Sequence, residues 1–253
     1  MATTRVNLYH EQFEKLLEDR GIDCIWERAA VCSCLNRDTG QPAFNCPICD
    51  GSGFRYLQGK KIRVAITALN SDYTLDTLML REPGTTYCTP KADVIMGFHD
   101  RLIFPDFKCT FSEVIKWDFE EDGDCLSHRT YRNVKSVIFL ADDKYEYENG
   151  VDFEVTDDNY HLHWINKDTA AQINKTNMSI LYYTTPSYLV EDLLHELRAT
   201  MSDRNTPTEI FRELPKQYQL KREDFSYGIK TPKSIGTSDE PQTIVDTGEG
   251  IGV

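Results

Sequence analysis

The chain has 253 residues, of which 40% are hydrophobic and 11% aromatic, and this composition excludes a chain that is disordered throughout. Its 28 basic and 41 acidic residues give a formal net charge of −13, which disfavours a conventional DNA- or RNA-binding module because such a surface repels phosphates. No apolar run approaches the roughly 20 residues of a membrane-spanning helix, and the first residues do not resemble a signal peptide. We therefore expect a protein that folds in a reducing cytosol.

The N-terminal segment is expected to form an amphipathic helix. Over residues 7–20, apolar side chains recur at helical spacing, and Gly21 is a stop signal. The stripe consists of Leu8, Tyr9, Phe13, Leu16 and Leu17. Such a stripe needs an apolar partner, which is either the core of this chain or a neighbouring subunit.

Four of the eight cysteines fall in two close pairs, Cys32 with Cys34 and Cys46 with Cys49. The polar loop between the pairs is rich in turn residues and can bring them together. Four thiolates at about 2.3 Å from a central ion form a closed tetrahedral zinc site, and C-x-x-C is a usual half of such a site. Because four cysteine ligands leave no position for water, we predict a structural rather than a catalytic Zn²⁺.

The alternatives to a metal site are two disulfides or four unrelated buried cysteines. Disulfides conflict with a reducing compartment, and chance does not readily place two such pairs side by side. Gly51 and Gly53 follow the second pair and permit positive φ, which lets backbone N–H groups point at sulfur. The other four cysteines are expected to be core residues, with Cys24 as an alternative ligand; they are Cys24, Cys88, Cys109 and Cys125.

After the cysteine loop the hydrophobic spacing changes from that of a helix to that of a strand. Alternation indicates a strand over residues 62–66, one long strand or two shorter ones over 107–119, and another strand over 178–183. The body of the chain, residues 61–228, is therefore expected to be an antiparallel β sandwich or barrel.

Two turns are expected inside this body. Asn149-Gly150 lies between alternating runs and predicts a two-residue type I′ hairpin within residues 144–155. Residues 157–159, Asp-Asp-Asn, predict a second turn that leads into a strand over residues 160–165.

The last part of the chain is less regular. Residues 187–199 have helical spacing and are expected to be a helix, although Pro186 and the β context allow a strand. Residues 203–228 are too broken to assign. The predicted organisation is a helix at residues 1–21, a zinc-knuckle segment at 22–60, the β-rich body at 61–228 and an extended acidic tail at 229–253, which neighbouring subunits are expected to hold.

The sequence offers weak candidates for a catalytic site. His161 and His163 share a strand face opposite Leu162 and Trp164, and a metal site there would be completed by His128, Asp157 or Asp158; the alternative is a solvated face of a hairpin. His99-Asp100 resembles half of a metal phosphohydrolase site, but no second matching set supports it. Nucleotide-binding, serine-hydrolase and zinc-protease motifs are missing from the sequence, so we expect a protein that is not an enzyme.

Acidic residues form two clusters, at residues 118–124 and 142–158. The second holds eight acids, opposed only by Lys144. Such a cluster is typical of a solvated face or loop. The functional alternative is an acidic surface that nucleic acid slides past without binding.

Together these features resemble the neck proteins of tailed bacteriophages, which are the head-completion or head-closure components between portal and tail. The likeness covers residues 8–57 through the helix, Cys32-x-Cys34 and Cys46-Pro47-x-Cys49-x-Gly51-x-Gly53, and continues as a general β-rich pattern to about residue 220. Residues 46–53 are also similar to one repeat of the cysteine-rich region of J-domain chaperones, but those proteins carry four such repeats and a His-Pro-Asp motif that this chain lacks.

The phage resemblance implies a virion structural protein that is assembled in the host cytoplasm. Its copies would form a homo-oligomeric ring between portal and tail, with portal or adaptor and tail proteins as partners and genomic DNA only passing through. No membrane partner is implied. A negative charge suits a channel through which DNA must slide.

Three other functions remain open at this point. A tail or baseplate component would share the acidic, β-rich character. A zinc-stabilised nucleic-acid or regulatory adaptor would use the basic residues near the cysteine loop, which are Arg37, Arg55, Lys60, Lys61 and Arg63. A metal-dependent hydrolase would use His161, His163 and Asp157.

Overall fold

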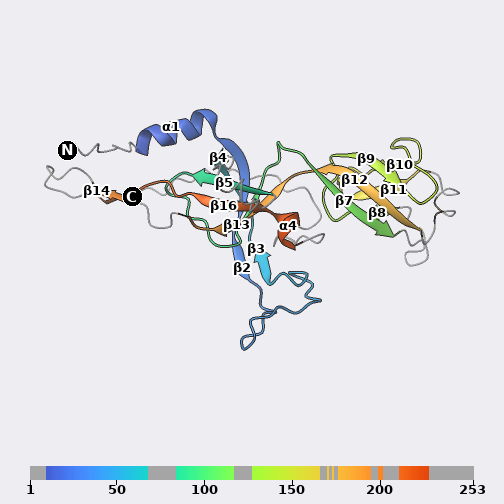
Figure 1. Cartoon of the computed structure of the whole chain (residues 1–253), viewed down its shortest axis with the longest axis horizontal. Helices are drawn as coiled ribbons and strands as arrows, with labels where there is room; N and C mark the ends of the chain where they lie inside the picture. The colour runs from blue at the N-terminus through green and yellow to red at the C-terminus, as the bar shows by residue number, and fades with distance from the viewer. Residues whose placement is uncertain are drawn as a thin grey trace, which may run out of the picture.

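The computed structural model describes residues 10–67, 84–116, 127–165, 170, 173, 176–194, 199–201 and 211–227. Within these residues the chain is mainly β, as predicted, with a closed six-stranded barrel, two three-stranded sheets and two helices. Figure 1 shows the barrel in the middle of an elongated molecule, with the two smaller sheets at one end and an arm that projects from the barrel.

The barrel is antiparallel throughout and closes because β1 pairs with both β4 and β6. In order around the barrel, its strands are β1 (Ile22–Glu27), β4 (Lys60–Thr67), β5 (Thr85–Pro90), β16 (Tyr218–Arg222), β13 (Ser187–Asp192) and β6 (Arg101–Ile103). Its core contains Cys24, Trp26, Val64, Cys88, Leu102, Val190 and Leu220. The strand predicted at residues 62–66 is confirmed as part of β4. Residues 22–27, which were assigned to the zinc-knuckle segment, form strand β1 of the barrel.

Helix α1 (His10–Arg20) precedes the barrel and ends where the Gly21 N–H donates to the Leu17 carbonyl over 2.8 Å. A side chain at Gly21 would meet that carbonyl oxygen and Arg63, so the chain can turn into β1 here only with glycine. Leu17 is buried, whereas Leu16 is 49% exposed. Leu8 and Tyr9 of the predicted apolar stripe lie outside the described residues, and the described part of the stripe is only partly covered by this chain.

The two smaller sheets enclose a second hydrophobic core. One contains β7 (Cys109–Lys116), β12 (Asn177–Thr184) and β9 (Ser136–Ala141), and the other contains β10 (Phe153–Val155), β11 (His161–Trp164) and β8 (Ser127–Arg129). Trp164 lies in the centre of this core, with the Tyr147 ring edge-on at 5.0 Å and the Phe153 ring at 6.0 Å. We call this part the sandwich. The chain therefore forms both of the predicted alternatives, a barrel and a sandwich.

The remaining elements are short. Strand β2 (Ala29–Val31) pairs with β3 (Phe54–Tyr56), and β14 (Ala199–Met201) pairs with β15 (Phe211–Glu213). Helix α4 (Glu223–Tyr227) follows β16 directly. Strands β7 and β12 confirm the alternation predicted over 107–119 and 178–183; Trp117, Phe119 and the acidic cluster at 118–124 lie outside the described residues, as does the tail at 229–253.

The helix predicted over residues 187–199 is wrong where the structure describes it, because residues 187–192 form β13. The pairing of β13 with β16 shifts between Val190 and Asp192, which is a β-bulge. Leu189 and Val190 lie before this shift and point to opposite faces, yet both are buried: Val190 packs in the barrel core and Leu189 is covered on the other side. Because both faces of β13 are covered, apolar residues do not alternate with polar ones along it, and this produced the spacing that resembles a helix.

The two-residue hairpin predicted at Asn149-Gly150 is also wrong. A type I′ turn needs positive φ at both central residues, but only Gly150 has it, at 85°. The turn is wider: the Glu148 N–H donates to the Asp152 carboxylate over 2.8 Å, and the Gly150 N–H donates to the Phe153 carbonyl over 2.7 Å. Residues 144–147 instead fold back onto the end of β9, where the Tyr147 N–H donates to the Leu140 carbonyl.

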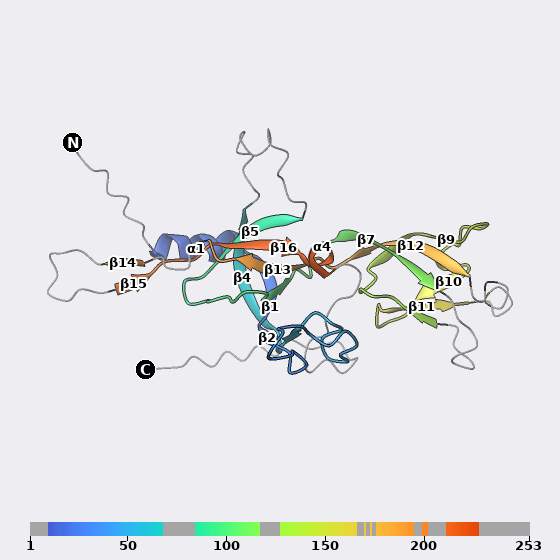
Figure 2. The same ribbon diagram turned by 60° about the horizontal axis from the view of Figure 1, so that its bottom comes forward.

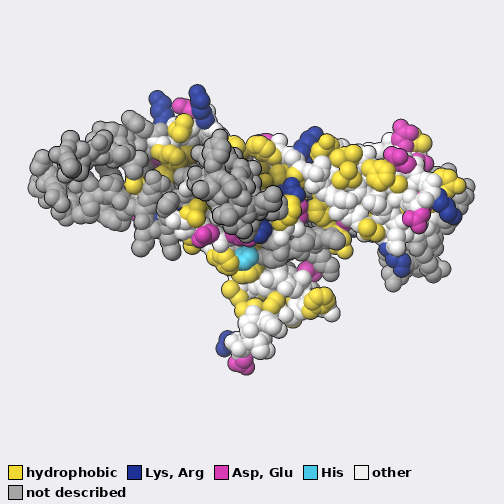
Figure 3. All heavy atoms as spheres, in the orientation of Figure 1, with side chains coloured by type: hydrophobic (Ala, Val, Ile, Leu, Met, Phe, Trp, Pro, Cys, Tyr) yellow, Lys and Arg dark blue, Asp and Glu magenta, His cyan; other side chains and the backbone are white. Residues whose placement is uncertain are grey.

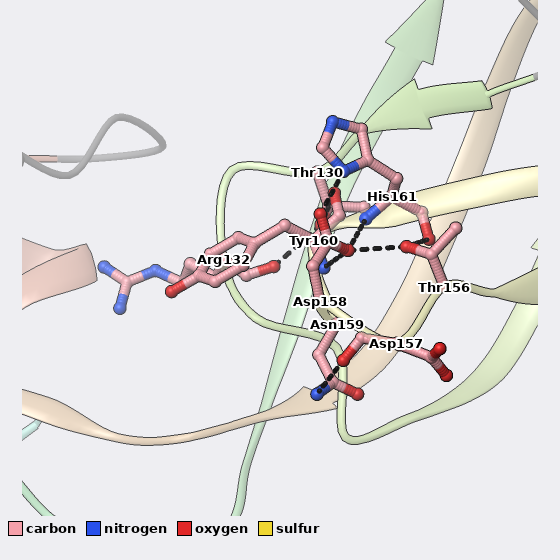
Figure 4. Close-up of polar contacts among 8 residues, drawn as sticks. All are labelled: Thr130, Arg132, Thr156, Asp157, Asp158, Asn159, Tyr160 and His161. Atoms are coloured by element: carbon pink, nitrogen blue, oxygen red, sulfur yellow. Dashed lines mark hydrogen bonds and ion pairs between the residues drawn. The ribbon is translucent and has the colours of Figure 1, made fainter. Parts of the chain in front are cut away.

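The turn predicted at residues 157–159 is confirmed between β10 and β11 (Figure 4). Asp158 organises it by accepting hydrogen bonds from the Thr156 hydroxyl and from the Tyr160 N–H, at 2.5 and 2.9 Å. Asn159 takes φ of 59°, a conformation that asparagine tolerates better than most residues. These contacts depress the pKa of Asp158 to about 2, even though burial acts in the opposite direction.

A buried polar network joins the barrel to the sandwich. Arg101 on β6 donates to Glu27 on β1 over 2.6 Å and to Glu223 on α4 over 3.3 Å. Glu223 also accepts from the Ser187 hydroxyl, which in turn accepts from Arg132 of the sandwich over 3.1 Å. Burial favours loss of the Arg101 charge, but the two carboxylates outweigh it and raise the pKa of Arg101. This network fixes where the two β units meet.

The sandwich core contains a carboxylate, Glu113 on β7, which is 3% exposed. It accepts hydrogen bonds from the Tyr182 hydroxyl over 2.9 Å and from the Tyr131 N–H over 3.2 Å. Burial raises the pKa of Glu113 and outweighs the lowering effect of these donors. The folded protein therefore holds a proton here more tightly than the unfolded chain does.

This pKa shift predicts how stability depends on pH. The contribution of Glu113 is fully present at acid pH and is lost as the pH rises from about 4 through its raised pKa. We expect Glu113→Gln, which keeps an oxygen for the Tyr182 hydroxyl, to flatten the fall in the free energy of unfolding over this range. Urea unfolding at a series of pH values measures it, with the exposed Glu154→Gln as the control. Equal pH dependence in wild type and Glu113→Gln would contradict the prediction.

Candidate metal centre

The four paired cysteines lie in an arm that leaves the barrel between β1 and β4. Strands β2 and β3 form a short ribbon at its base, with Ala29 opposite Tyr56 and Val31 opposite Phe54. The loop between them closes where the Cys32 N–H donates to the Gly53 carbonyl over 2.8 Å. Figures 1 and 2 show the arm projecting from the barrel, separate from the sandwich.

The structure brings all four predicted ligands together. The sulfur atoms of Cys32, Cys34, Cys46 and Cys49 all lie within 4.8 Å of one another. The Cys32–Cys46 and Cys34–Cys49 sulfur separations are 3.8 and 3.5 Å. A tetrahedron of sulfur atoms around zinc has edges of about 3.8 Å, because each Zn–S bond is about 2.3 Å. The donor set and its spacing therefore fit a four-coordinate metal ion, and the described cysteines form no disulfide.

The surroundings of the sulfur atoms favour thiolate at Cys46 and thiol at Cys34. Backbone hydrogen bonds from Cys49 and Ile48 lower the pKa of Cys46 to about 7. A backbone hydrogen bond from Ala43 lowers the pKa of Cys34, but burial and hydrogen bonds to the other three thiols raise it to about 12. Four cysteines this close together do not all become thiolates by themselves, because their negative charges repel. A divalent ion stabilises the thiolates and displaces the remaining protons.

The turns of the loop have the geometry expected from its glycines. Gly51 and Gly53 have φ of 84° and 81°, and Asp50 has φ of 47°. A side chain at Gly51 would approach the Phe44 carbonyl oxygen to 3.0 Å, so both its conformation and its surroundings favour glycine. The N–H groups that act on Cys46 belong to Ile48 and Cys49, inside the C-x-x-C turn rather than at the glycines.

The arm has almost no hydrophobic core of its own. The buried side chains of its loop are Cys32, Cys46 and Cys49, with Cys34 packed against them. The largest apolar side chain of the loop, Phe44, is 86% exposed, and Ile48 is 42% exposed. Whatever holds the four sulfur atoms together therefore also holds the loop together.

Asp100 fixes the base of the arm to the barrel, a role that the sequence did not suggest. Its carboxylate accepts hydrogen bonds from the Trp26 indole, the Ala29 N–H and the Gly97 N–H, at 2.8, 2.9 and 2.8 Å. Its neighbour His99 stacks on Phe54 of β3, with ring centroids 4.3 Å apart. Asp100 is 3% exposed. His99 and Asp100, which resemble half of a hydrolase site in sequence, therefore have structural contacts at the base of the arm.

Of the other cysteines, which were expected to be core residues, the structure confirms two. Cys24 and Cys88 are fully buried in the barrel, and Cys24 is therefore not an alternative ligand of the arm. Burial raises the pKa of Cys24 to about 12. Cys109 at the start of β7 is half-buried, and Cys125 lies outside the described residues.

The histidine candidates do not assemble a second metal site in the part of the chain that the structure describes. His161 and His163 share the face of β11 opposite the buried Leu162 and Trp164, as predicted. His161 pairs with Asp158 over 2.5 Å within the β10–β11 turn (Figure 4). Over the described ranges, the four cysteines are the only group of three or more metal-ligating side chains close enough to share an ion.

The basic residues near the cysteine loop do not form one free patch. Lys61 and Arg63 both pair with Asp23, at 3.2 and 2.6 Å. Arg63 also donates to the Glu18 carbonyl at the end of α1. Two of the five candidate side chains therefore bind to groups of this chain rather than forming part of a phosphate-binding surface.

Comparison with protein-family models and with curated proteins gives no match for this sequence. Among the described residues, neither helix has the length and apolar character that crossing a bilayer requires.

Proposed function

We propose that this chain is a structural protein of a phage neck, a ring component between portal and tail, and that its arm holds one Zn²⁺ ion and docks the ring onto a neighbouring component. The proposal joins the sequence resemblance to one structural observation. The loop that holds the four-sulfur cluster projects from the barrel and exposes apolar side chains.

The donor set favours Zn²⁺ over other ions. Soft thiolate ligands select zinc, copper(I) or iron–sulfur clusters, and two short cysteine pairs in a tetrahedral arrangement are typical of structural zinc. Bound zinc would supply rigidity and no chemistry, because four sulfur ligands leave no position for a substrate or for water. Cys32, Cys34, Cys46 and Cys49 would be its ligands.

The shape and anchoring of the arm support a docking role. Phe44, Ile48 and Val31 expose apolar surface that costs free energy in water, and Val31 is 61% exposed. Asp100 and the Phe54–His99 stack fix the arm to the barrel, so that little conformational entropy would be lost on binding. A rigid arm with exposed apolar side chains suits an element that must dock onto a partner.

The net charge of −13 supports the part of the proposal that concerns DNA. A ring protein with this charge repels phosphate, so that genomic DNA would pass without adhering. The basic candidates that an adaptor function needs are partly neutralised by Asp23. We therefore favour a structural role over nucleic-acid recognition.

This proposal predicts that the exposed apolar side chains of the arm's loop are needed for docking but not for folding. Full-length protein is mixed with portal-containing heads and with free tails of its virus, and co-sedimentation and native mass are measured. Wild type is expected to join one of these fractions as a ring, and Phe44→Ser with Ile48→Ser is expected to weaken binding by at least about tenfold, since apolar anchors dominate such contacts.

The control is Val114→Ser, at an apolar residue of the sandwich that is 65% exposed, and this variant should bind as wild type does. Metal content and melting temperature should be unchanged in both variants. Protein that carries zinc but joins neither fraction would overturn the neck proposal. Binding that is insensitive to Phe44 and Ile48 would overturn the role of the arm.

A further inference from the structure

A groove of about 510 Å³ lies on the sandwich, far from the cysteine arm in the fold. It is lined by one strand edge and by the segment that follows it: Val137, Ile138, Phe139, Leu140, Glu146, Tyr147, Glu148, Asn149 and Phe153. Leu140, Tyr147 and Phe153 form a buried apolar floor. Ile138 and Phe139 leave apolar surface open, at 45% and 37% exposure.

The groove exists because two chain segments that begin as a pair separate. Ala141 bridges to Glu146, and the Tyr147 N–H donates to the Leu140 carbonyl. Beyond this point β9 continues beside β12, while residues 148–153 cross to β10 in the other sheet. Within the described part of the chain, residues 136–139 of β9 pair with β12 on one side only, because residues 145–147 contact the strand only at its end. An edge strand beside an apolar groove is a template for an added strand.

The acidic residues at the rim of the groove differ in whether neighbouring groups already donate hydrogen bonds to them. Asp142 is occupied by the Lys144 and Tyr145 N–H groups and the Tyr147 hydroxyl, and Asp152 is occupied by the Glu148 N–H. Glu146 and Glu148 are exposed, and their carboxylates have no ion pair with any residue that the structure describes. Figure 3 shows acidic side chains next to hydrophobic ones at this end of the molecule.

We propose that this groove binds an extended segment of another protein in which Lys or Arg alternates with apolar residues, and that the segment pairs with β9 as an added strand. Alternation is required because successive side chains of a strand point to opposite sides. The apolar side chains would contact the Leu140–Phe153 floor, and the basic ones would meet Glu146 and Glu148. Main-chain hydrogen bonds to β9 would supply affinity, and the two carboxylates would supply selectivity.

The inference does not depend on the neck proposal, because it uses no residue of the arm. It also excludes nucleic acid as the occupant, since two unpaired carboxylates at the rim repel phosphate. The surface therefore selects for a basic peptide by charge and for an extended one by geometry.

The test uses a fluorescent peptide in which Lys alternates with Val, titrated with the full-length protein in a polarization assay. Three comparison peptides replace Lys by Glu, replace Val by Ser, or carry N-methyl groups on alternate backbone nitrogens. We expect saturable binding of the Lys–Val peptide, weakened at least about tenfold by each replacement, because each removes one of the three sources of binding.

The matching protein variant is Glu146→Lys with Glu148→Lys, which should abolish binding of the Lys–Val peptide and create binding of the Glu–Val peptide. Glu154→Lys with Asp157→Lys changes the net charge equally at exposed acids outside the groove and should bind as wild type does. Melting curves verify that both variants fold. Absence of binding, equal loss in the two variants, or tight binding of the N-methylated peptide would each overturn the proposal.

Discussion

Replacing Cys46 with serine is expected to empty the metal centre and to unfold the loop over residues 32–53, while the barrel and the sandwich stay folded. The buried side chains of this loop are themselves the cysteines, so no apolar core remains when the ion is lost. Folding free energy and metal-binding free energy are the same quantity in such a segment. Metal content should fall from about one ion per chain to near zero, because three cysteines do not close the site.

Limited proteolysis and elemental analysis of the purified protein measure both effects. New cleavage sites should appear within residues 32–53 and not in β7 or β12. Cys109→Ser is the control, because Cys109 lies at the start of β7 in the sandwich, and it should retain the full metal content. A Cys46→Ser protein with an intact loop and wild-type metal content would contradict the assignment of the ligands.

Replacing Arg101 with methionine is expected to cost about 3–5 kcal/mol of unfolding free energy, because the change leaves two buried carboxylates without their cation. Glu27 and Glu223 are 5% and 0% exposed, so water does not replace the guanidinium. The aromatic ring of Tyr56 also lies against Arg101, 4.0 Å from its central carbon. The loss should therefore affect the barrel, the base of the arm and the junction with the sandwich together.

Urea denaturation of the full chain measures this cost. Lys91→Met is the matched control, since it removes a lysine that pairs with Glu18 over 3.0 Å at the surface. Lys91 is 37% exposed and Glu18 is 61% exposed, so this change should stay within about 1 kcal/mol. If both variants lose the same small amount, the buried network does not stabilise the fold in the way described above.

The four-cysteine cluster could be predicted from the sequence because all its members lie within one short segment. The spacing of two cysteine pairs around a turn-rich loop is local information, and the structure places the four sulfur atoms together. Strands β4, β7 and β12 were predictable for a similar reason, since each alternates regularly between a buried and an exposed face.

The features that the sequence did not reveal depend on contacts between distant segments. The Trp26 indole and the Asp100 carboxylate are 74 positions apart, and no local pattern distinguishes Asp100 from an exposed acid. Arg101 and Glu223 are 122 positions apart and meet only because the barrel closes. The prediction of a helix failed at β13 because both faces of this strand are covered, so that the adjacent Leu189 and Val190 are both apolar and both buried.

The most direct test of the central claim is the metal content of the purified full-length chain, measured together with its melting profile before and after chelation. The account predicts about one zinc ion per chain, bound more weakly at acid pH because protons compete for the thiolates. Removal of zinc should abolish the protection of residues 32–53 against proteolysis and leave the main transition of the barrel in place. A metal-free protein with the same melting profile and a protected arm would contradict the structural zinc centre and, with it, the docking role built upon it.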